Sequence, residues 1–371
     1  MIVETAGLRP DQRILNMGPQ HPSMHGVLRL VVTLEGESVT DVRPDIGYLH
    51  RSTEWIGERR TYAQFVPYTD RLDYVSGTSN NLAYVLAVEK LAGIEVPPRA
   101  TYIRMLLAEL NRIASHLIWL GTFALDLGAW SVFLYCFRER EYILDILEEC
   151  TGARLTYSWF RIGGVPDDLP PAFVRRTRKF LRLMPGRLDE NDTLLTGNRI
   201  FRARTEGVGI LDPQAAISYG ASGPVLRGSG VEFDVRRAEP YAAYDKLDFR
   251  VPTHPSGDCL GRYLVRIEEM RQSLRLIEQC LEGLPEGDVL VKIPRSFKPP
   301  AGEAYSRVES PRGDFGVYIV SDGSPKPARL RLRAPSFCNL AALPAMAQGL
   351  KIADIVAIVG SIDIVLGEVD R

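Results

Sequence analysis

The sequence predicts an α+β fold: a mainly helical core built as a long helix bundle, with small antiparallel β-sheets near the N-terminus and before the C-terminus. Three observations lead to this prediction. Apolar residues recur at helical spacing over 99–126. Two extended runs flank Glu35-Gly36-Glu37 near the start of the chain, and two more, 315–320 and 328–333, flank a turn rich in Gly, Ser and Pro.

The N-terminal sheet is predicted to carry a rigid loop, Met17 to Gly26. Its prolines fix φ and lack a backbone N–H, and its glycines permit positive φ, so a stiff turn is expected rather than helix or strand. A strand over 27–34, the turn at Glu35-Gly36-Glu37 and a second extended run to Ile46 follow.

Helical patterns fill most of the remaining chain. They cover Gly47 to about Leu91, Arg99 to about Asp126, Ser131 to Cys150, about Ala172 to Gly207, Gly257 to Gly283, and the tail from Ser336. In the second of these helices Ile103, Leu106, Leu107, Leu110, Ile113, Ala114, Leu117 and Leu120 form an apolar stripe, with Glu109, Asn111, Arg112 and His116 beside it. His116 is expected to be a hydrogen-bonded packing residue.

These patterns suggest one continuous globular unit with four regions. Residues 1–48 form an N-terminal β region with the histidine loop, 49–285 a helical core, 286–335 a β-hairpin region, and 336–371 a helical tail that packs back on the core.

Composition limits the classes of function. The formal net charge of -1 leaves no general basic surface, which disfavours nucleic acid as a partner. No signal peptide is expected, because the start at residues 1–5 has no basic n-region or long apolar core. No membrane span is expected either, because charged residues interrupt the longest apolar stretches. Five cysteines lie far apart without any CxxC pair, which argues against a zinc ribbon, an iron-sulphur cluster held by this chain alone, or a disulfide framework. They are expected to be buried, reduced thiols of the cytosol.

Several familiar catalytic motifs are absent from the sequence, including GxxxxGK[ST], strand-embedded GxGxxG, HExxH and GxSxG. His21 and His25 have the i,i+4 spacing of a helical metal site, but Pro22 and Gly26 disfavour a helix there. The alternatives for this loop are a turn that presents an imidazole for catalysis and a stiff turn whose histidines bond to nearby carbonyl groups.

Two further side chains could move protons. Tyr74 lies in a segment rich in polar and aromatic residues, 67–76, and its phenol could donate a proton to a strongly basic reduced intermediate. Asp126 lies in an apolar stretch, where a carboxylate needs a partner such as an imidazole. The structural alternatives are a packed aromatic ring for Tyr74 and a helix cap or salt-bridge residue for Asp126.

Five long motifs in order resemble one protein family. They are Asn16 to Gly26, Ile46 to Arg51, Pro67 to Tyr74, Phe160-Arg161-Ile162-Gly163-Gly164-Val165 and the final Gly367-Glu368-Val369-Asp370-Arg371. Together they resemble, nearly end to end, the D-subunit family of bacterial NADH-quinone oxidoreductase, respiratory complex I. The resemblance implies the fold of a nickel-iron hydrogenase large subunit that has lost its nickel.

The sequence agrees with this loss. Hydrogenases of the superfamily hold nickel with two CxxC pairs, and the matching positions here are Asp73 and Ser76, then Val365 and Glu368. Without thiolates, binding of a soft metal is not expected, so the alternative of an active membrane-bound hydrogenase is rejected.

The resemblance assigns roles to named residues. His25 and Tyr74 match the two ligands of the quinone headgroup and expected proton donors, and Asp126 matches the acid paired with the histidine. Arg51 and Arg71 match arginines beside the terminal iron-sulphur cluster of a neighbouring protein in the complex, where a cation favours cluster reduction. Their structural alternatives are salt bridges to Glu54 or Asp70.

The resemblance also implies a setting. The substrate is a quinone, ubiquinone or menaquinone, and no metal is bound by this chain. The partners are the small iron-sulphur protein of the complex (its B-subunit), the C-subunit, and the membrane-arm protein of the quinone channel. The expected location is the cytoplasmic face of the bacterial inner membrane, as a peripheral component. Alternatives are the equivalent component of a complex fed by ferredoxin or reduced coenzyme F420, and a non-catalytic scaffold.

Three positions depart from the family pattern. Thr156 stands where many members have a histidine near the cluster, which puts a pH-dependent cluster potential in doubt. Ser52 and Trp55 replace the usual Gly and Lys after the His-Arg pair. These departures concern tuning of the cluster rather than the quinone site.

Overall fold

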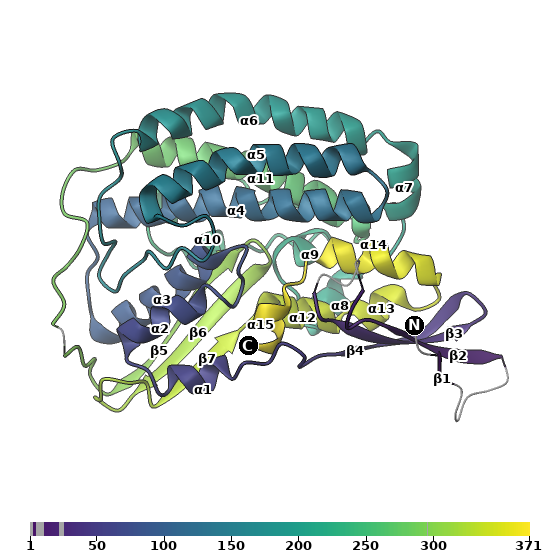
Figure 1. Cartoon of the computed structure of the whole chain (residues 1–371), viewed down its shortest axis with the longest axis horizontal. Helices are drawn as coiled ribbons and strands as arrows, with labels where there is room; N and C mark the ends of the chain where they lie inside the picture. The colour runs from purple at the N-terminus through teal and green to yellow at the C-terminus, as the bar shows by residue number, and fades with distance from the viewer. Residues whose placement is uncertain (1–2, 5–10, 22–25, 295) are drawn as a thin grey trace.

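The structure, a computed structural model, describes residues 3–4, 11–21, 26–294 and 296–371. A helical bundle lies along one side of the molecule, and two antiparallel sheets lie beneath it in the view of Figure 1, one near each end of the molecule. The C-terminal turn lies between the two sheets (Figure 1). The predicted α+β class is confirmed.

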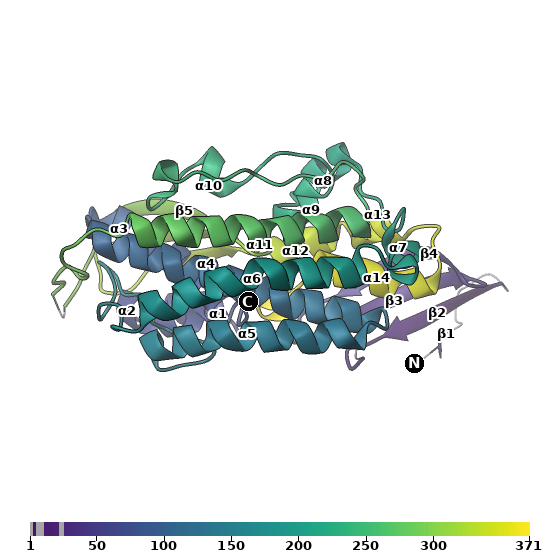
Figure 2. The ribbon, with the colours of Figure 1, turned by 90° about the horizontal axis from the view of Figure 1, so that it is seen from above.

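Four long helices form the bundle. They are α4 (Pro98–Asp126), α5 (Trp130–Thr151), α6 (Phe173–Leu195) and α11 (Cys259–Glu282). Helix α4 packs against α5 and α11, and α6 packs against the same two helices. Figure 2 shows the four axes running nearly parallel. The predicted long helices over 99–126, 131–150 and 257–283 are therefore confirmed to within a few residues.

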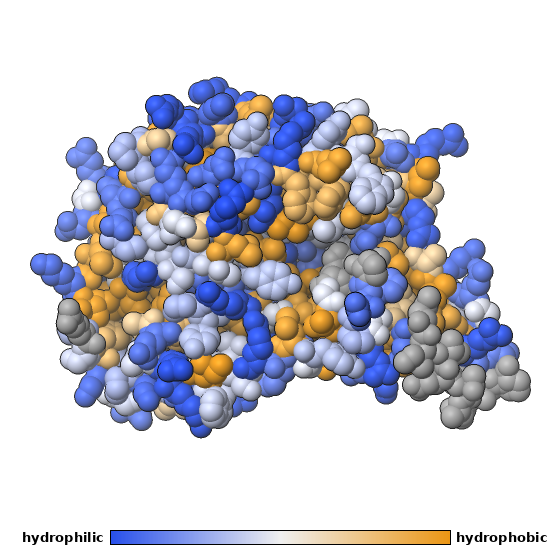
Figure 3. Space-filling view, in the orientation of Figure 1, coloured by the Kyte–Doolittle hydropathy of each residue, from blue (hydrophilic) through white to orange (hydrophobic). Residues whose placement is uncertain are grey.

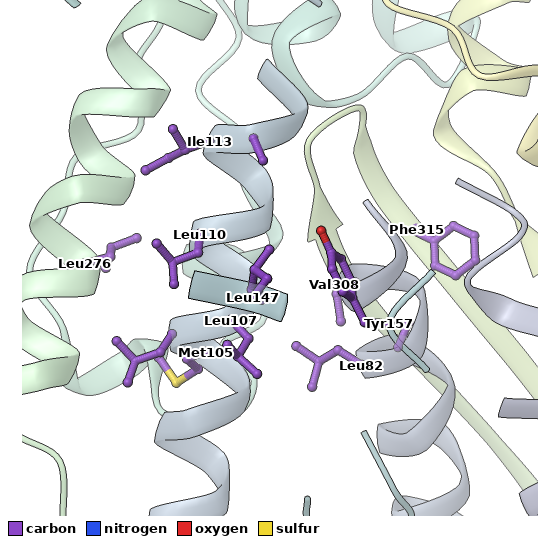
Figure 4. Packing of buried hydrophobic residues seen from close by; sticks show 14 of the residues in the cluster. Leu82, Met105, Leu107, Leu110, Ile113, Leu147, Tyr157, Leu276, Val308 and Phe315 are labelled. Carbon is purple, nitrogen blue, oxygen red and sulfur yellow. The ribbon is translucent and has the colours of Figure 1, made fainter. Parts of the chain in front are cut away.

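Helix α4 is the centre of the bundle. All eight residues of its predicted apolar stripe are buried. Figure 4 shows Leu110 of α4 and Leu276 of α11 pointing toward each other. The residues beside the stripe are buried too, because α3 (Gly77–Ala92), α5, α11 and α14 (Ile352–Ile362) cover α4 on several sides. His116 is one of them, and its Nε2 lies 3.0 Å from Glu269 Oε2, which confirms its role as a hydrogen-bonded packing residue.

The N-terminal sheet has four strands in the order β1-β2-β3-β4: β1 (Val3–Glu4), β2 (Gln12–Met17), β3 (Arg29–Glu35) and β4 (Ser38–Asp45). The predicted hairpin at residues 35–38 is confirmed, with Glu35 opposite Ser38. Alternate residues of β3, Leu30, Val32 and Leu34, are buried, so one face of the sheet packs on the protein.

The C-terminal sheet has three strands in the order β5-β6-β7: β5 (Gly302–Ser310), β6 (Gly313–Ser321) and β7 (Arg329–Arg333). The predicted hairpin is the β6-β7 pair. Strand β5 is not evident as a separate strand in the sequence, because its alternation is interrupted by Ser306 and Arg307. Helix α3 (Gly77–Ala92) packs on this sheet.

Two predicted helical stretches are interrupted. Residues 47–91 contain three helices, α1 (Thr53–Gly57), α2 (Tyr62–Thr69) and α3, because Thr61 starts α2 with a capping box and a loop follows at 70–76. Residues 172–207 contain α6 and α7 (Arg199–Thr205), because Asn198 caps a new helix with its side chain.

Shorter helices complete the chain. They are α8 (Pro213–Ser218), α9 (Gly223–Arg227), α10 (Val235–Ala238), the 3-10 helix η2 (Tyr244–Lys246), α12 (Pro335–Ala341), α13 (Leu343–Ala347), α14 (Ile352–Ile362) and α15 (Leu366–Asp370). None of the helices described is long and apolar enough to cross a membrane.

The five cysteines differ in their burial. Cys136, Cys259 and Cys280 are buried free thiols, as predicted, whereas Cys150 and Cys338 are only partly buried.

Figure 3 shows hydrophilic residues over much of one face and an apolar patch over the part of α5 nearest α7. In the first two turns of α5, Trp130 is 66% exposed and Leu134 60% exposed.

Candidate functional site

Tyr74 lies in the loop that joins α2 to α3. The preceding residue, Asp73, shapes this loop: its Oδ1 accepts hydrogen bonds from the N–H groups of Val75 and Ser76, both at 3.2 Å. Asn111 of α4 donates from Nδ2 to the Val75 carbonyl at 3.1 Å. The loop is therefore anchored on both sides of Tyr74.

The phenol of Tyr74 is available to a ligand. The residue is 36% exposed, and the part of the chain that the structure describes gives its hydroxyl group no hydrogen-bond partner. Burial raises the pKa of Tyr74, the nearby Asp73 carboxylate raises it further, and the cations of Arg312 and Arg51 oppose this shift. The hydroxyl group is thus protonated at neutral pH and can act as a donor.

The four positions that the family resemblance predicts to match hydrogenase nickel ligands are all buried. Asp73, Ser76 and Glu368 are inaccessible, and Val365 is 5% exposed. The two segments touch through their backbones, since a Cβ on Gly367 would lie 2.5 Å from the Leu72 carbonyl oxygen. The structure therefore brings the first pair of positions next to the second.

Glu368 carries an unusual carboxyl group. Its Oε1 accepts a hydrogen bond from the Ser336 N–H at 2.9 Å, while its Oε2 is buried without a hydrogen bond in the described structure. Burial raises its pKa to about 7, and the charge of Asp73 adds to the shift. A carboxyl group that can hold a proton near neutral pH thus lies beside the Tyr74 loop.

A stability measurement tests this protonation. A carboxyl group whose pKa is raised in the folded state stabilises the fold at pH values below its ordinary pKa of 4.5. This stabilisation is lost as the pH rises through about 7. Glu368→Gln removes that loss, so its free energy of unfolding relative to the wild type should rise by on the order of 2 kcal/mol between pH 5 and pH 8. Urea unfolding at the two pH values measures it. The exposed control Glu95→Gln should show no such rise, and an equal Glu368→Gln difference at both pH values would refute the assignment.

Arg51 is fixed beside these segments. Its Nη2 donates to the carbonyl groups of Arg71 at 2.7 Å and Gly367 at 3.1 Å. The alternative salt bridge to Glu54 is not formed, because Glu54 Oε2 lies 2.6 Å from Arg331 Nη1 instead.

The loop before Arg51 is held by Asp370, near the C-terminal end of the chain. The N–H groups of Gly47 and Leu49 donate to the Asp370 carboxylate at 2.8 and 2.7 Å. His50 Nδ1 lies 2.7 Å from the Asp370 carbonyl oxygen. The motifs 46–51 and 367–371, far apart in sequence, thus form one structure.

Arg71 has the neighbour that its structural alternative requires. Its Nη1 lies 3.6 Å from Asp70 Oδ2, and it also donates to the Pro67 carbonyl group at 2.6 Å. The side chain remains 48% exposed. Burial raises the pKa of Asp70 to about 7, and the Arg71 cation works against that shift. An ion pair with Asp70 does not prevent Arg71 from facing a partner.

Asp126 is among the described residues, whereas His25 is not. Asp126 is the last residue of α4 and is half-buried. An anion is unfavourable at a helix C-terminus, so a cationic or hydrogen-bonding partner is expected there. His25 lies outside the described residues. The next residue, Gly26, lies near Leu366 of α15, because a Cβ added at Gly26 would lie 3.9 Å from the Leu366 side chain.

The base of the histidine loop is closed by Gly18. Its φ is +83°, and an added Cβ would lie 2.0 Å from the Leu28 carbonyl oxygen. Gly18→Ala should therefore distort the backbone here and destabilise the chain by about 1 to 3 kcal/mol in urea unfolding. Gly36→Ala is the matched control, since its φ is +62° and its Cβ would meet no atom within 4 Å. Equal free energies of unfolding for the two variants would contradict this prediction.

Of the three departures, Ser52 and Trp55 line the same cavity, and Thr156 is not part of its lining. Ser52 and Thr156 both have left-handed backbone, with φ of 55° and 51°, which is unusual for a β-branched threonine. Trp55 is 55% exposed, and the Arg59 guanidinium lies 3.5 Å from its ring centroid. A cavity of about 700 Å³ opens beside Trp55, and Arg51 and Arg371 are among the residues that line it.

The sequence interpretation missed Arg312, which forms ion pairs with Asp73 at 3.1 Å and Asp363 at 3.0 Å. An arginine just before a predicted strand is a weak signal, because it does not reveal a partner 239 residues earlier in the chain. Among the described residues, no group of three or more His, Cys, Asp or Glu side chains could hold a metal ion.

Comparison with known proteins places the chain. The family model described as "Respiratory-chain NADH dehydrogenase, 49 Kd subunit" matches residues 126–299 and 291–371. The NADH-quinone oxidoreductase D-subunit of Dehalococcoides mccartyi is 54% identical over 98% of this chain and 100% of its own length. The NADH-quinone oxidoreductase D-subunit 2 of Solibacter usitatus is 54% identical over 98% of this chain and 98% of its own length. The D-subunit of Desulforamulus reducens is 52% identical over 98% of this chain and 99% of its own length. The chain therefore belongs to the family of NADH-quinone oxidoreductase D-subunits, the 49 kDa component of respiratory-chain NADH dehydrogenase, and is part of an oxidoreductase complex.

Proposed function

We propose that this chain forms the quinone headgroup site of a proton-translocating NADH-quinone oxidoreductase. Two electrons reach the quinone from the terminal iron-sulphur cluster of the adjacent small iron-sulphur protein, and two protons convert the reduced headgroup to the quinol. Tyr74 and His25 donate these protons. Asp126 is the acid that pairs with the His25 imidazole and favours its protonated form.

The observation that carries the proposal is the setting of Tyr74. Its hydroxyl group has no described partner, its loop is anchored by Asp73 and Asn111, and the buried former ligand positions lie alongside. A phenol with a raised pKa keeps its proton until a strongly basic oxygen develops on the reduced headgroup. The loop then delivers that proton in a fixed orientation.

The arginines serve the electron-transfer side. Arg51 joins the carbonyl groups of Arg71 and Gly367, so its cation is fixed at the contact of the two segments. Arg71 is half-exposed and can face the cluster of the small iron-sulphur protein. Positive charge there favours the reduced form of the cluster. The C-subunit and the membrane-arm protein of the quinone channel are the other proposed partners, at the cytoplasmic face of the inner membrane.

The direct test uses Tyr74→Phe and His25→Ala in the assembled complex. Both should lower the rate of quinone reduction while the complex still assembles. Normal rates in both variants would contradict this site and favour the alternative, a non-catalytic scaffold with an inert cavity. Replacing NADH with reduced ferredoxin or reduced coenzyme F420 as the electron donor then identifies the donor module.

Metal analysis provides an independent test of the lost nickel site. The positions equivalent to thiolate ligands are Asp73, Ser76, Val365 and Glu368, and Asp73 is already paired with Arg312. The purified chain should therefore contain far less than one nickel ion per molecule after growth with nickel. Stoichiometric nickel would overturn this part of the proposal.

A further inference from the structure

Arg312 is a buried cation at the tip of the β5-β6 hairpin. It is 1% exposed and lies between the end of β5 at Ser310 and the start of β6 at Gly313. Its backbone N–H donates to Ser310 Oγ at 3.3 Å, and its carbonyl group accepts from Asn339 Nδ2 at 3.1 Å. The tip of the hairpin is therefore tied to α12, which fixes the origin of the Arg312 side chain.

The guanidinium group connects the two segments that meet at the site. Nη1 donates to Asp73 Oδ2 at 3.1 Å, and Nη2 donates to Asp363 Oδ1 at 3.0 Å. Nη1 also donates to the Ser115 hydroxyl group of α4. Asp73 immediately precedes Tyr74, and Asp363 follows α14 at the start of the segment that leads to Glu368. One side chain thus links α4, the Tyr74 loop and the C-terminal segment.

The charges around this contact make Arg312 hard to replace. Three buried acids lie here, Asp73, Asp363 and Glu368, at 0% to 5% exposure. Arg266 lies 3.9 Å from Asp363, but within the described structure Asp73 forms an ion pair with Arg312 alone. Loss of the guanidinium group would leave Asp73 as a buried charge without a counter-ion, which is costly and favours movement of its loop.

We propose that Arg312 is a positioning residue of the quinone site, one that holds the Asp73 carboxylate against the C-terminal segment and thereby sets the place and the acidity of the Tyr74 hydroxyl group. Three charged groups act on Tyr74: Asp73 from its own loop, Arg51 from the segment before α1, and Arg312 from the β5-β6 turn. Glu368 of α15 acts on Arg312 and Asp73 in turn. This inference rests on the proposed function, in which Tyr74 donates a proton.

The test compares four variants in the assembled complex: Arg312→Met, Arg312→Lys, Tyr74→Phe and the double variant Arg312→Met with Tyr74→Phe. Arg312→Met should lower kcat for quinone reduction by about tenfold with a smaller change in KM, because the headgroup still enters while its proton donor is misplaced. Removing the cation should move the alkaline limb of the kcat profile up by about one pH unit. Arg312→Lys should show little of this shift and keep a pH profile close to that of the wild type, since it keeps the charge.

Controls separate this role from a merely structural one. Arg307→Met removes a charge from the same hairpin, where Arg307 pairs with Glu239 and Asp314 away from Tyr74, and should leave kcat and the pH profile unchanged. In the Tyr74→Phe background, Arg312→Met should cause no pH shift. If Arg312→Met fails to assemble, the Arg312→Lys and Arg312→Gln pair provides the same comparison.

The outcomes distinguish the two proposals. A normal rate in Tyr74→Phe would remove the proposed proton-donor role of Tyr74 and this inference with it. A slow Tyr74→Phe together with unchanged kcat and pH profile in Arg312→Met, or in Arg312→Gln if Arg312→Met does not assemble, would overturn the role of Arg312 alone. A pH shift that persists in the Tyr74→Phe background would also overturn it, because the shift would then come from another group.

Discussion

Tyr74→Phe should reduce quinone reduction by the assembled complex about 100-fold, the lower end of the usual contribution of a positioned general acid. The substitution removes only the hydroxyl group, which has no hydrogen-bond partner in the described structure, so the loop and the packing of the ring should not change. The loss should appear in kcat, because proton transfer occurs after the quinone has bound.

Tyr68→Phe is the matched control for this experiment. Tyr68 lies in the same motif, but its ring stacks on Phe65 with centroids 5.7 Å apart, so its role is packing. It should keep nearly the full rate. Equal rates for Tyr74→Phe and Tyr68→Phe would contradict the proton-donor role of Tyr74.

Arg104→Met should be the most destabilising of the proposed substitutions, at about 3 to 5 kcal/mol, because it leaves a buried carboxylate unpaired. Arg104 donates to both oxygens of Glu89, at 3.0 and 2.7 Å, and to the carbonyl groups of Arg161 and Gly164. Glu89 also accepts from the Gly163 N–H at 2.7 Å. One buried pair therefore fastens the Phe160 to Val165 motif to α3 and α4.

Chemical denaturation of the purified chain measures this effect. Arg99→Met on the same helix is the control: its partner Asp168 is 51% exposed at the side chain, so the cost should stay within about 1 kcal/mol. Similar free energies of unfolding for the two variants would show that the Arg104 pair does not stabilise the fold.

The helical part of the fold could be predicted from the sequence because it depends on local spacing. The stripe from Ile103 to Leu120 identifies α4, and Pro98 lies in its first turn. The break at Asp73 could not be predicted in the same way. Asp73 shapes the loop between α2 and α3 by accepting hydrogen bonds from the backbone N–H groups of Val75 and Ser76, and such bonds leave no periodic signal.

The site could be predicted only in part, for a physical reason. Tyr74 is a candidate because of its residue type and its motif, and the structure leaves its hydroxyl group without a described partner. Arg312 is not identifiable in this way, because the contact with Asp73 joins residues 239 positions apart. His25, by contrast, rests on the family resemblance, since it lies outside the described residues.

The most direct measurement of the central claim is an electron cryomicroscopy structure of the whole complex with bound quinone. We expect one carbonyl oxygen of the headgroup within hydrogen-bond distance of the Tyr74 hydroxyl group, about 2.6 to 3.2 Å, with the His25 imidazole near the other. A headgroup bound elsewhere, such as in the cavity between Arg51 and Arg371, with Tyr74 left without contact, would contradict the account.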